Sequence, residues 1–424
     1  MRLVFLLFLS ISSFTKADSL PVILPTLLTS DFKIKQATSE LASARFFIDQ
    51  KNADWLPQLN LKISEGWENV FVANRGVTDL QRREWGLSFT QLITDFGMTS
   101  GSVEVANVKF TKKKIDLQAV KQKVIFSGIK AYLEIYRLKE QLRYAQLSEK
   151  NIKKQTGMEE ARVQRGSGFS TDVLQSKSKL ANAFARTARA QGELAKAINN
   201  FTTLYQFAPK VLTDFNLPDA PVKFLPETIN QTIAIAQEFN TAIIQAKFDV
   251  NIAQADITAA RSKHFPTIAF NADIIHRHND YGQFGDKEEY RVGIDLNMPI
   301  FSGGRDQAGL DQSYADLNAK KDKSLDVQRD VEKKVRNAWQ DLQTDQLNAH
   351  YLRNSATISE EFLVLARQER KLGRRSLIDV LSEENSYINA LEAAVSAETS
   401  VFISSYRLLE AMGILNQHMV TSKI

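Results

Sequence analysis

Five polar residues in the third quarter of the chain have side chains that could bind a metal ion. His276 and His278 are two positions apart, so both imidazoles would lie on one face if that segment were extended. Asp286, Glu288 and Glu289 follow closely and offer the carboxylate oxygens that hard cations prefer. We expect a solvated external loop between His276 and Glu289. A metal site at the histidines and a cation site at the carboxylates are the alternatives.

The rest of the sequence offers little further chemistry. It has no phosphate-binding glycine loop, no H-E-x-x-H zinc motif and no evident pairing of a nucleophile with a base. It has no cysteine, so we expect no disulfide, no thiolate ligand and no acylated lipoprotein cysteine. The net charge of +5 is weak for a nucleic-acid-binding chain of this size. We therefore expect no enzymatic activity, no cofactor and no nucleic-acid partner, and the energy for any transport would have to come from another protein.

The chain repeats its own pattern over a long interval. It reads TQLITDFG up to Gly97 and NMPIFSGG up to Gly304, while RGSGFSTDVL and LGRRSLIDVL surround Gly166 and Gly373. Both pairs of glycines are 207 positions apart (304 − 97 and 373 − 166). Repeats must be recognised first because they determine architecture, and this period is far too long for a solenoid. The pattern indicates a duplicated unit.

Within each unit, long stretches without proline permit very long helices. None of the nine prolines lies between Pro57 and Pro209 or after Pro299. Proline costs roughly 3 kcal/mol inside a helix, and an uninterrupted helix rises about 1.5 Å per residue. Apolar residues recur there at spacings of three and four, as in packed antiparallel helices. We predict helical hairpins over about 97–207 and 304–413, with their tips near 166–171 and 373–377.

Four segments alternate apolar and polar residues, which predicts strands over about 58–72, 82–93, 266–276 and 289–299. A half-buried sheet on a soluble core would show the same alternation. Lengths near ten residues, aromatic residues near the strand ends and the lack of a long apolar helix favour an outer-membrane barrel. Four strands cannot close such a barrel, and an open sheet edge is not tolerated in lipid, so the chains would have to oligomerise.

The first 17 residues have the pattern of a secretory signal peptide. Arg2 is followed by an apolar stretch over 3–14 and a small residue, Ala17, at a plausible cleavage site. A buried N-terminal helix is the alternative. We then expect a first repeat over 18–225, which ends in an irregular segment over 208–225, and a second repeat over 226–424.

Together these features resemble the TolC family of outer-membrane export channels, over roughly residues 20–417. The resemblance implies a mixed fold, in which a membrane β-barrel is joined to a long α-helical coiled-coil barrel. It also implies a homotrimer whose twelve-stranded barrel, four strands per protomer, crosses the outer membrane lipid bilayer. The helices would continue the channel as a periplasmic tunnel. The hairpin tips would narrow this tunnel and dock a periplasmic adaptor protein (membrane fusion protein). The docking residues implied are Gly166, Gly168 and Gly373.

The hairpin that begins GRRSLIDVLSEEN most resembles the branch of the family that works in type I secretion. In that branch the channel serves an inner-membrane ABC transporter and passes exported protein cargo. Export of small molecules or drugs is the alternative. Two other classes are a soluble periplasmic coiled-coil interaction protein, which would not need amphipathic hairpins, and the adaptor itself, which should carry an inner-membrane anchor.

The resemblance also implies a gate at the tips. Asp172 and Arg375 would help to hold the periplasmic end closed, and three copies of Asp379 would form a negative ring at the pore constriction. Family channels often have a second acid one turn later, whereas this chain has Ser382 there, with Glu383 beside it. Asp172 and Asp379 could instead be acids that stabilise helix N-termini, and the tip glycines could serve only the turns.

Overall fold

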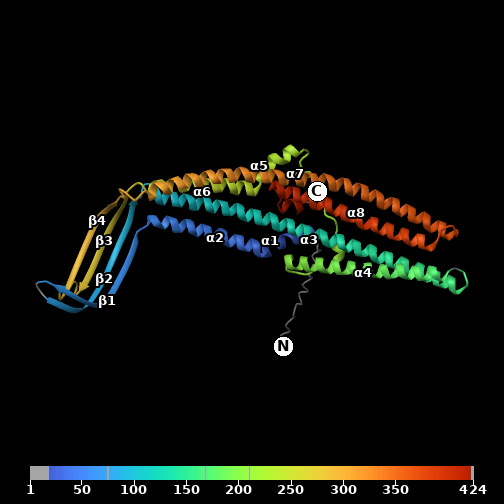
Figure 1. The fold of residues 1–424 in the computed structure, drawn as a ribbon, viewed down its shortest axis with the longest axis horizontal. Helices are drawn as coiled ribbons and strands as arrows, with labels where there is room; N and C mark the ends of the chain where they lie inside the picture. The colour runs from blue at the N-terminus through green and yellow to red at the C-terminus, as the bar shows by residue number, and fades with distance from the viewer. Residues whose placement is uncertain (1–18, 74–75, 168, 210, 422–424) are drawn as a thin grey trace, which may run out of the picture. The chain divides into compact units, whose positions relative to one another are not determined.

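The computed structural model describes residues 19–73, 76–167, 169–209 and 211–421. The predicted signal peptide (1–17) and Gly168 lie outside these ranges. The helices are α1 (Leu20–Ser30), α2 (Phe32–Asn52), α3 (Met98–Gln164), α4 (Ser170–Tyr205), α5 (Ile229–Phe239), α6 (Thr241–Ser262), α7 (Arg305–Lys371), α8 (Leu377–Met412) and α9 (His418–Thr421). The strands are β1 (Gln58–Val72), β2 (Gly76–Thr94), β3 (Thr267–His278) and β4 (Asp286–Asn297) (Figure 1).

The duplication predicted from the sequence is evident in the element lengths. α3 and α7 each have 67 residues, and α4 and α8, which follow them, each have 36. Each long helix is preceded by a pair of antiparallel strands. The predicted order of strand, strand, helix and helix therefore occurs twice, with four strands in the protomer.

The chain divides into two compact units. The sheet belongs to the unit formed by Gln36–Gln118 and Thr241–Arg329. Its strands are antiparallel in the order β1-β2-β3-β4. One face carries the apolar side chains, and Leu61, Ile63 and Val292 on it are between 64% and 75% exposed. Such a face is stable only against a partner or a lipid phase.

Within the same unit the helices pack around small residues and ion pairs. Ala253 and Ile257 of α6 contact Leu317 of α7. Lys112 of α3 pairs with Asp249 of α6 at 2.5 Å. Small side chains at these seams let the helix axes approach closely.

The other unit contains Met1–Lys35, Ala119–Asn240 and Asp330–Ile424. α1 packs so closely on α3 that a Cβ atom at Gly128 would come within 2.6 Å of Leu27 and 2.9 Å of the Tyr205 hydroxyl. Beside this contact Phe201 stacks on Tyr205, with ring centroids 4.2 Å apart. This buried cluster fixes the C-terminal end of α4.

The segment over 208–225, predicted to be irregular, has no α-helix or strand among its described residues and contains 3₁₀ turns at Leu212–Asp214 and Val222–Phe224. Helices α1, α2, α5 and α6 are additional to the elements that the sequence pattern predicts. For α5 a local signal exists, since Thr228 and Gln231 form a capping box in which each side chain accepts from the backbone N–H of the other residue.

Candidate functional site at the hairpin tips

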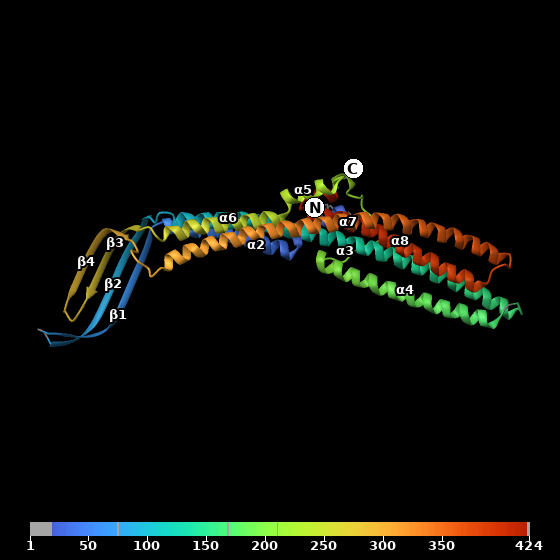
Figure 2. The same ribbon diagram turned by 45° about the horizontal axis from the view of Figure 1, so that its top comes forward.

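The turns of the two hairpins lie at the same end of their unit (Figure 1; Figure 2). Each is built on a glycine in the left-handed region, Gly166 with φ +78° and Gly373 with φ +74°. In both turns the next residue donates its N–H five residues back, Ser167 to the Arg162 carbonyl at 3.0 Å and Arg374 to that of Glu369 at 2.9 Å. This is a standard helix C-terminal motif that favours glycine. Glycine is therefore required at both tips by backbone conformation.

The helices that follow the turns begin differently. Ser376 is the N-cap of α8, and its Oγ accepts from the N–H of Asp379 at 3.1 Å. α4 is preceded by Phe169, whose side chain makes no capping hydrogen bond. Ser170 and Thr171, whose hydroxyl groups could cap a helix, both lie inside α4 and not at its N-cap.

The proposed gate residues are not brought together within one protomer. Asp172 and Asp379 lie in the first turns of α4 and α8, where carboxylates interact favourably with the helix dipole. Neither forms an ion pair with a described residue of the protomer. Arg375 donates from Nε to Glu369 at 2.7 Å and lies over the ring of Phe362. Any contact between Asp172 and Arg375 would have to form between protomers.

A buried ion pair joins the two hairpins near their tips. Arg370 of α7 donates from Nη2 to Glu159 of α3 at 2.7 Å, and Glu159 is 4% exposed. Arg370 also donates to the carbonyl oxygen of Arg375 at 3.3 Å. The contact therefore ties the second tip turn to the first hairpin.

A second polar link lies further along the hairpins. Glu384 of α8, also 4% exposed, accepts from Asn151 of α3 at 2.7 Å and pairs with Arg367 of α7. Arg367 and Arg370 are three positions apart, so they lie on the same side of α7. A buried carboxylate that loses its partner is costly, so removing one partner from either link should destabilise the packing of the hairpins.

Apolar contacts surround these links and centre on α8. Leu377 and Leu381 pack with Ile152 of α3 and Ala183 of α4. Further along α8, a second cluster contains Tyr144, Ile388 and Val395. A third cluster, at the start of α8, contains Leu363, Ala366 and Val380. α8 is thus in contact with α3, α4 and α7. A change in the position of α8 must disturb all three contacts.

Sequence reasoning missed Glu159, Arg367, Arg370 and Glu384. A charged residue on a long helix usually faces solvent, and helical periodicity does not show which charge is buried. The arginine pair at i and i+3 was the one local signal, and it does not identify the acids across the interface.

The histidines and acids of the sheet do not form a metal centre. His276 and His278 lie on β3, not in a loop, because β3 extends to His278. The Nδ1 atom of His278 is hydrogen-bonded to Oδ1 of Asp286 at 2.7 Å. His276 stacks on Trp85, with ring centroids 5.7 Å apart. Among the described residues, no group of three or more histidine or acidic side chains is arranged to hold a metal ion. Among the helices that the structure describes, none combines the length and low polarity that a membrane-crossing helix requires.

Comparison with known proteins gives a consistent result. The family described as "outer membrane efflux protein" matches the chain twice, over residues 23–205 and 232–414. The outer membrane efflux protein BepC of Brucella suis is 27% identical over 332 residues, which cover 77% of this chain and 71% of BepC. The outer membrane protein TolC of Escherichia coli is 19% identical over 418 residues, which cover 96% of this chain and 84% of TolC.

A solved structure shares the fold. The crystal structure of CusC superposes with a TM-score of 0.79 at 20% identity, over 93% of this chain and 92% of CusC. The predicted fold class, strands and long helical hairpins in a duplicated order, is confirmed.

Proposed function

We propose that this chain, which belongs to the outer membrane efflux protein family and is an outer-membrane efflux channel with a periplasmic tunnel, serves type I secretion. In this role it is the exit duct for protein cargo, which reaches it from an inner-membrane ABC transporter through a periplasmic adaptor. The resemblance of the second hairpin, from Gly373 onward, carries this choice of cargo.

The assembly that this function needs follows from the sheet. β1 and β4 are its outer strands, and among the described residues each pairs on one side only. Unpaired backbone groups are not tolerated in the hydrocarbon region. We propose that β4 of one copy pairs with β1 of the next, and that three copies close a twelve-stranded barrel.

The links at the tips support a gate at the periplasmic end. In this proposal the Glu159–Arg370 ion pair and the hydrogen bond from Asn151 to Glu384 keep α7 and α8 against α3 in the closed state. Opening separates the hairpins and exchanges these buried contacts for water. Asp172, Arg375 and Asp379 act between protomers, around the constriction.

The tip turns also offer a surface for the adaptor. Phe169 and Leu372 flank the two turns and are 74% and 71% exposed. Large apolar side chains exposed at the end of a helical hairpin are suited to a partner that buries them. We propose that Phe169 and Leu372 supply the apolar contact, and that Gly166 and Gly373 shape the turns that present it.

Export of small solutes is the second candidate function, because the cation efflux system protein CusC of Escherichia coli is 22% identical over 400 residues. Deleting the chromosomal copy separates the two. Type I secretion predicts that a large protein disappears from the culture medium and returns on complementation. An unchanged set of secreted proteins, together with greater sensitivity to metal ions, dyes or detergents, would instead establish solute efflux.

A further inference from the structure

The β3–β4 loop, residues 279–285, folds back onto the polar face of the sheet. The β1–β2 ladder continues past the end of β3, so the first residues of β2, before Arg83, have no β3 residue paired with them. The loop covers the polar face of the sheet at this end. A Cβ atom at Gly282 would come within 2.5 Å of Thr78 Oγ1 and 3.3 Å of Val70. Leu80, an apolar residue on the polar face, is only 6% exposed.

The loop has a defined structure of its own. The Asn279 N–H donates to the Gly285 carbonyl at 2.9 Å, and the Gly285 N–H donates to Asn279 Oδ1 at 3.1 Å. Asn279 also donates from Nδ2 to the carbonyl of Gln81 on β2 at 3.1 Å. Asn279, Tyr281 and Gly282 all have positive φ. A loop closed in this way holds one position over the sheet.

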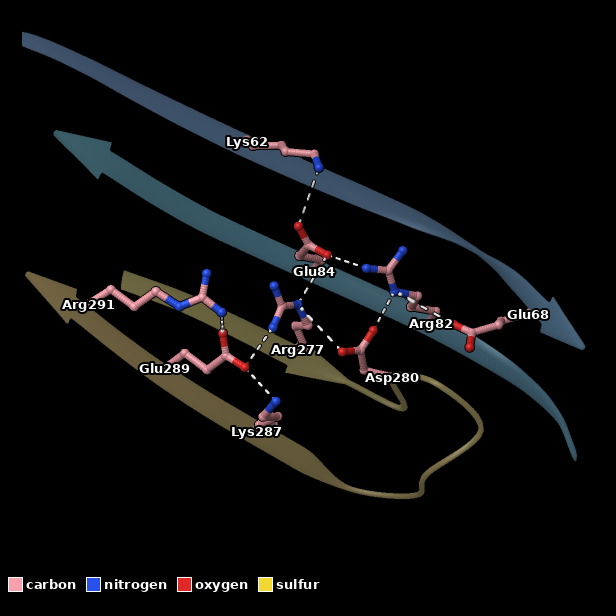
Figure 3. A network of polar contacts seen from close by, with 9 residues as sticks. All are labelled: Lys62, Glu68, Arg82, Glu84, Arg277, Asp280, Lys287, Glu289 and Arg291. Atoms are coloured by element: carbon pink, nitrogen blue, oxygen red, sulfur yellow. Dashed lines mark hydrogen bonds and ion pairs between the residues drawn. The ribbon is translucent and has the colours of Figure 1, made fainter. Parts of the chain in front are cut away.

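Asp280 is the charged contact between the loop and the strands. It is 8% exposed and lies between two arginines of the polar face (Figure 3). Arg82 of β2 donates from Nε to Asp280 Oδ1 at 2.9 Å, and the Nε of Arg277 on β3 is 3.5 Å from Oδ2. The loop is therefore attached to two strands by one carboxylate.

The two arginines have other acidic partners on the strands. Arg82 also pairs with Glu84 and with Glu68. Arg277 also pairs with Glu84 at 3.4 Å and with Glu289 at 2.9 Å. Removing the charge of Asp280 therefore leaves both guanidinium groups paired within the sheet. The strand network remains, and only the loop loses its ionic attachment.

From this geometry we propose that the β3–β4 loop is a second constriction, at the external mouth of the channel, held in place by Asp280. The polar face of a membrane barrel lines its interior, so a loop folded onto that face narrows the opening. Tyr281 and Phe284 in the loop are 74% and 81% exposed. The loop sets the largest solute that passes the mouth, and these aromatic side chains form its surface toward cargo. The inference rests on the proposed assembly into a closed barrel.

The test compares Asp280→Asn with Asp79→Asn in single-channel recordings of the full mature protein in planar bilayers. Asp79 is an exposed acid of β2 on the opposite, apolar face and forms no ion pair with a described residue. Asp280→Asn should raise conductance above that of the wild type, whereas Asp79→Asn should not. Equal conductance of all three proteins would overturn the constriction. A wild-type protein that forms no channel would instead refute the proposed function.

A reversible lock distinguishes loop release from loss of charge alone. The chain has no cysteine, so Thr78→Cys with Gly282→Cys introduces the one available disulfide across the close contact between strand and loop. In the Asp280→Asn background, oxidation should return conductance to the wild-type value, and a reductant should raise it again. If the locked channel keeps the high conductance of Asp280→Asn, the loop does not form the constriction.

Discussion

The two helical hairpins have the same length and the same glycine turn, yet they pack differently. Fifteen residues of α8 are buried, against eight of α4, although each helix has 36 residues. α4 keeps Leu174 and Phe184 exposed, whereas α8 is in contact with three other helices. Duplication therefore produced two copies of one scaffold that pack differently within the protomer. α8 lies among three other helices, whereas α4 leaves more of its surface exposed.

The largest expected effect on stability comes from comparing the loss of a buried ion pair with the loss of an exposed one. Arg370→Met leaves Glu159 buried with only the longer contact to Arg162 at 3.6 Å, which should cost up to about 3 kcal/mol, the lower end of the range for buried pairs. Lys177→Met breaks the exposed pair with Glu160 and should cost only about 0–1 kcal/mol. Thermal unfolding followed by circular dichroism measures both. Equal losses would mean that the buried pair between the hairpins contributes no more than the exposed pair within the first hairpin.

The next largest effect, the loss of stability on replacing a tip glycine, should be the same in both hairpins. Gly166→Ala and Gly373→Ala place a side chain in the left-handed region, which costs about 1–2 kcal/mol at each turn. A Cβ atom there would meet no other atom within 4 Å, so backbone strain alone acts. Hydrogen exchange should rise equally in the last turns of α3 and α7. A much larger rise in one of them would reveal a contact that the other turn lacks.

Substitutions at the N-caps of α8 and α4 should distinguish effects on helix stability from effects on adaptor docking. Ser376→Ala removes a capping hydrogen bond and should cost about 1 kcal/mol. Phe169→Ser introduces a capping side chain and should stabilise α4, while it removes the apolar surface offered to the adaptor. The measurement is thermal stability together with crosslinking of the tip to the adaptor. Full crosslinking by Phe169→Ser would show that the adaptor does not contact this side chain.

The smallest effect concerns pH. Burial in the helix bundle raises the pKa of Glu392 on α8 above its ordinary value of 4.5, and the charge of Arg186 on α4 partly opposes this. The folded state therefore holds the proton more tightly than the unfolded state, so stability falls as the pH rises from 4.5 through the folded pKa. Glu392→Gln should flatten this dependence in melting temperatures recorded over that range. An unchanged slope would assign the pH dependence to other groups.

The sequence predicts those structural features that depend on neighbouring residues, and it does not predict contacts between residues far apart in the chain. Gly166 and Gly373 mark the turns because a left-handed residue is required at one position, and alternation marks strands because successive side chains face opposite ways. Arg370, the partner of Glu159 in the other hairpin, is 211 residues away, and no local pattern predicts this contact. The same limit applies to the loop contact of Asp280, which depends on how far the β1–β2 ladder extends past β3. Gate residues carried over from the resemblance remain predictions, since Arg375 contacts Glu369 and Phe362 and not Asp172 within the protomer.

Single-channel recording of the wild type, Arg370→Met and Lys177→Met in planar bilayers tests the central claim most directly. The central claim is that the links between the two hairpins hold the channel closed at its periplasmic end. It predicts a small conductance for the wild type, a larger one for Arg370→Met and no change for Lys177→Met. A wild-type protein that inserts without forming a channel, or an Arg370→Met channel with the same conductance as Lys177→Met, would contradict it.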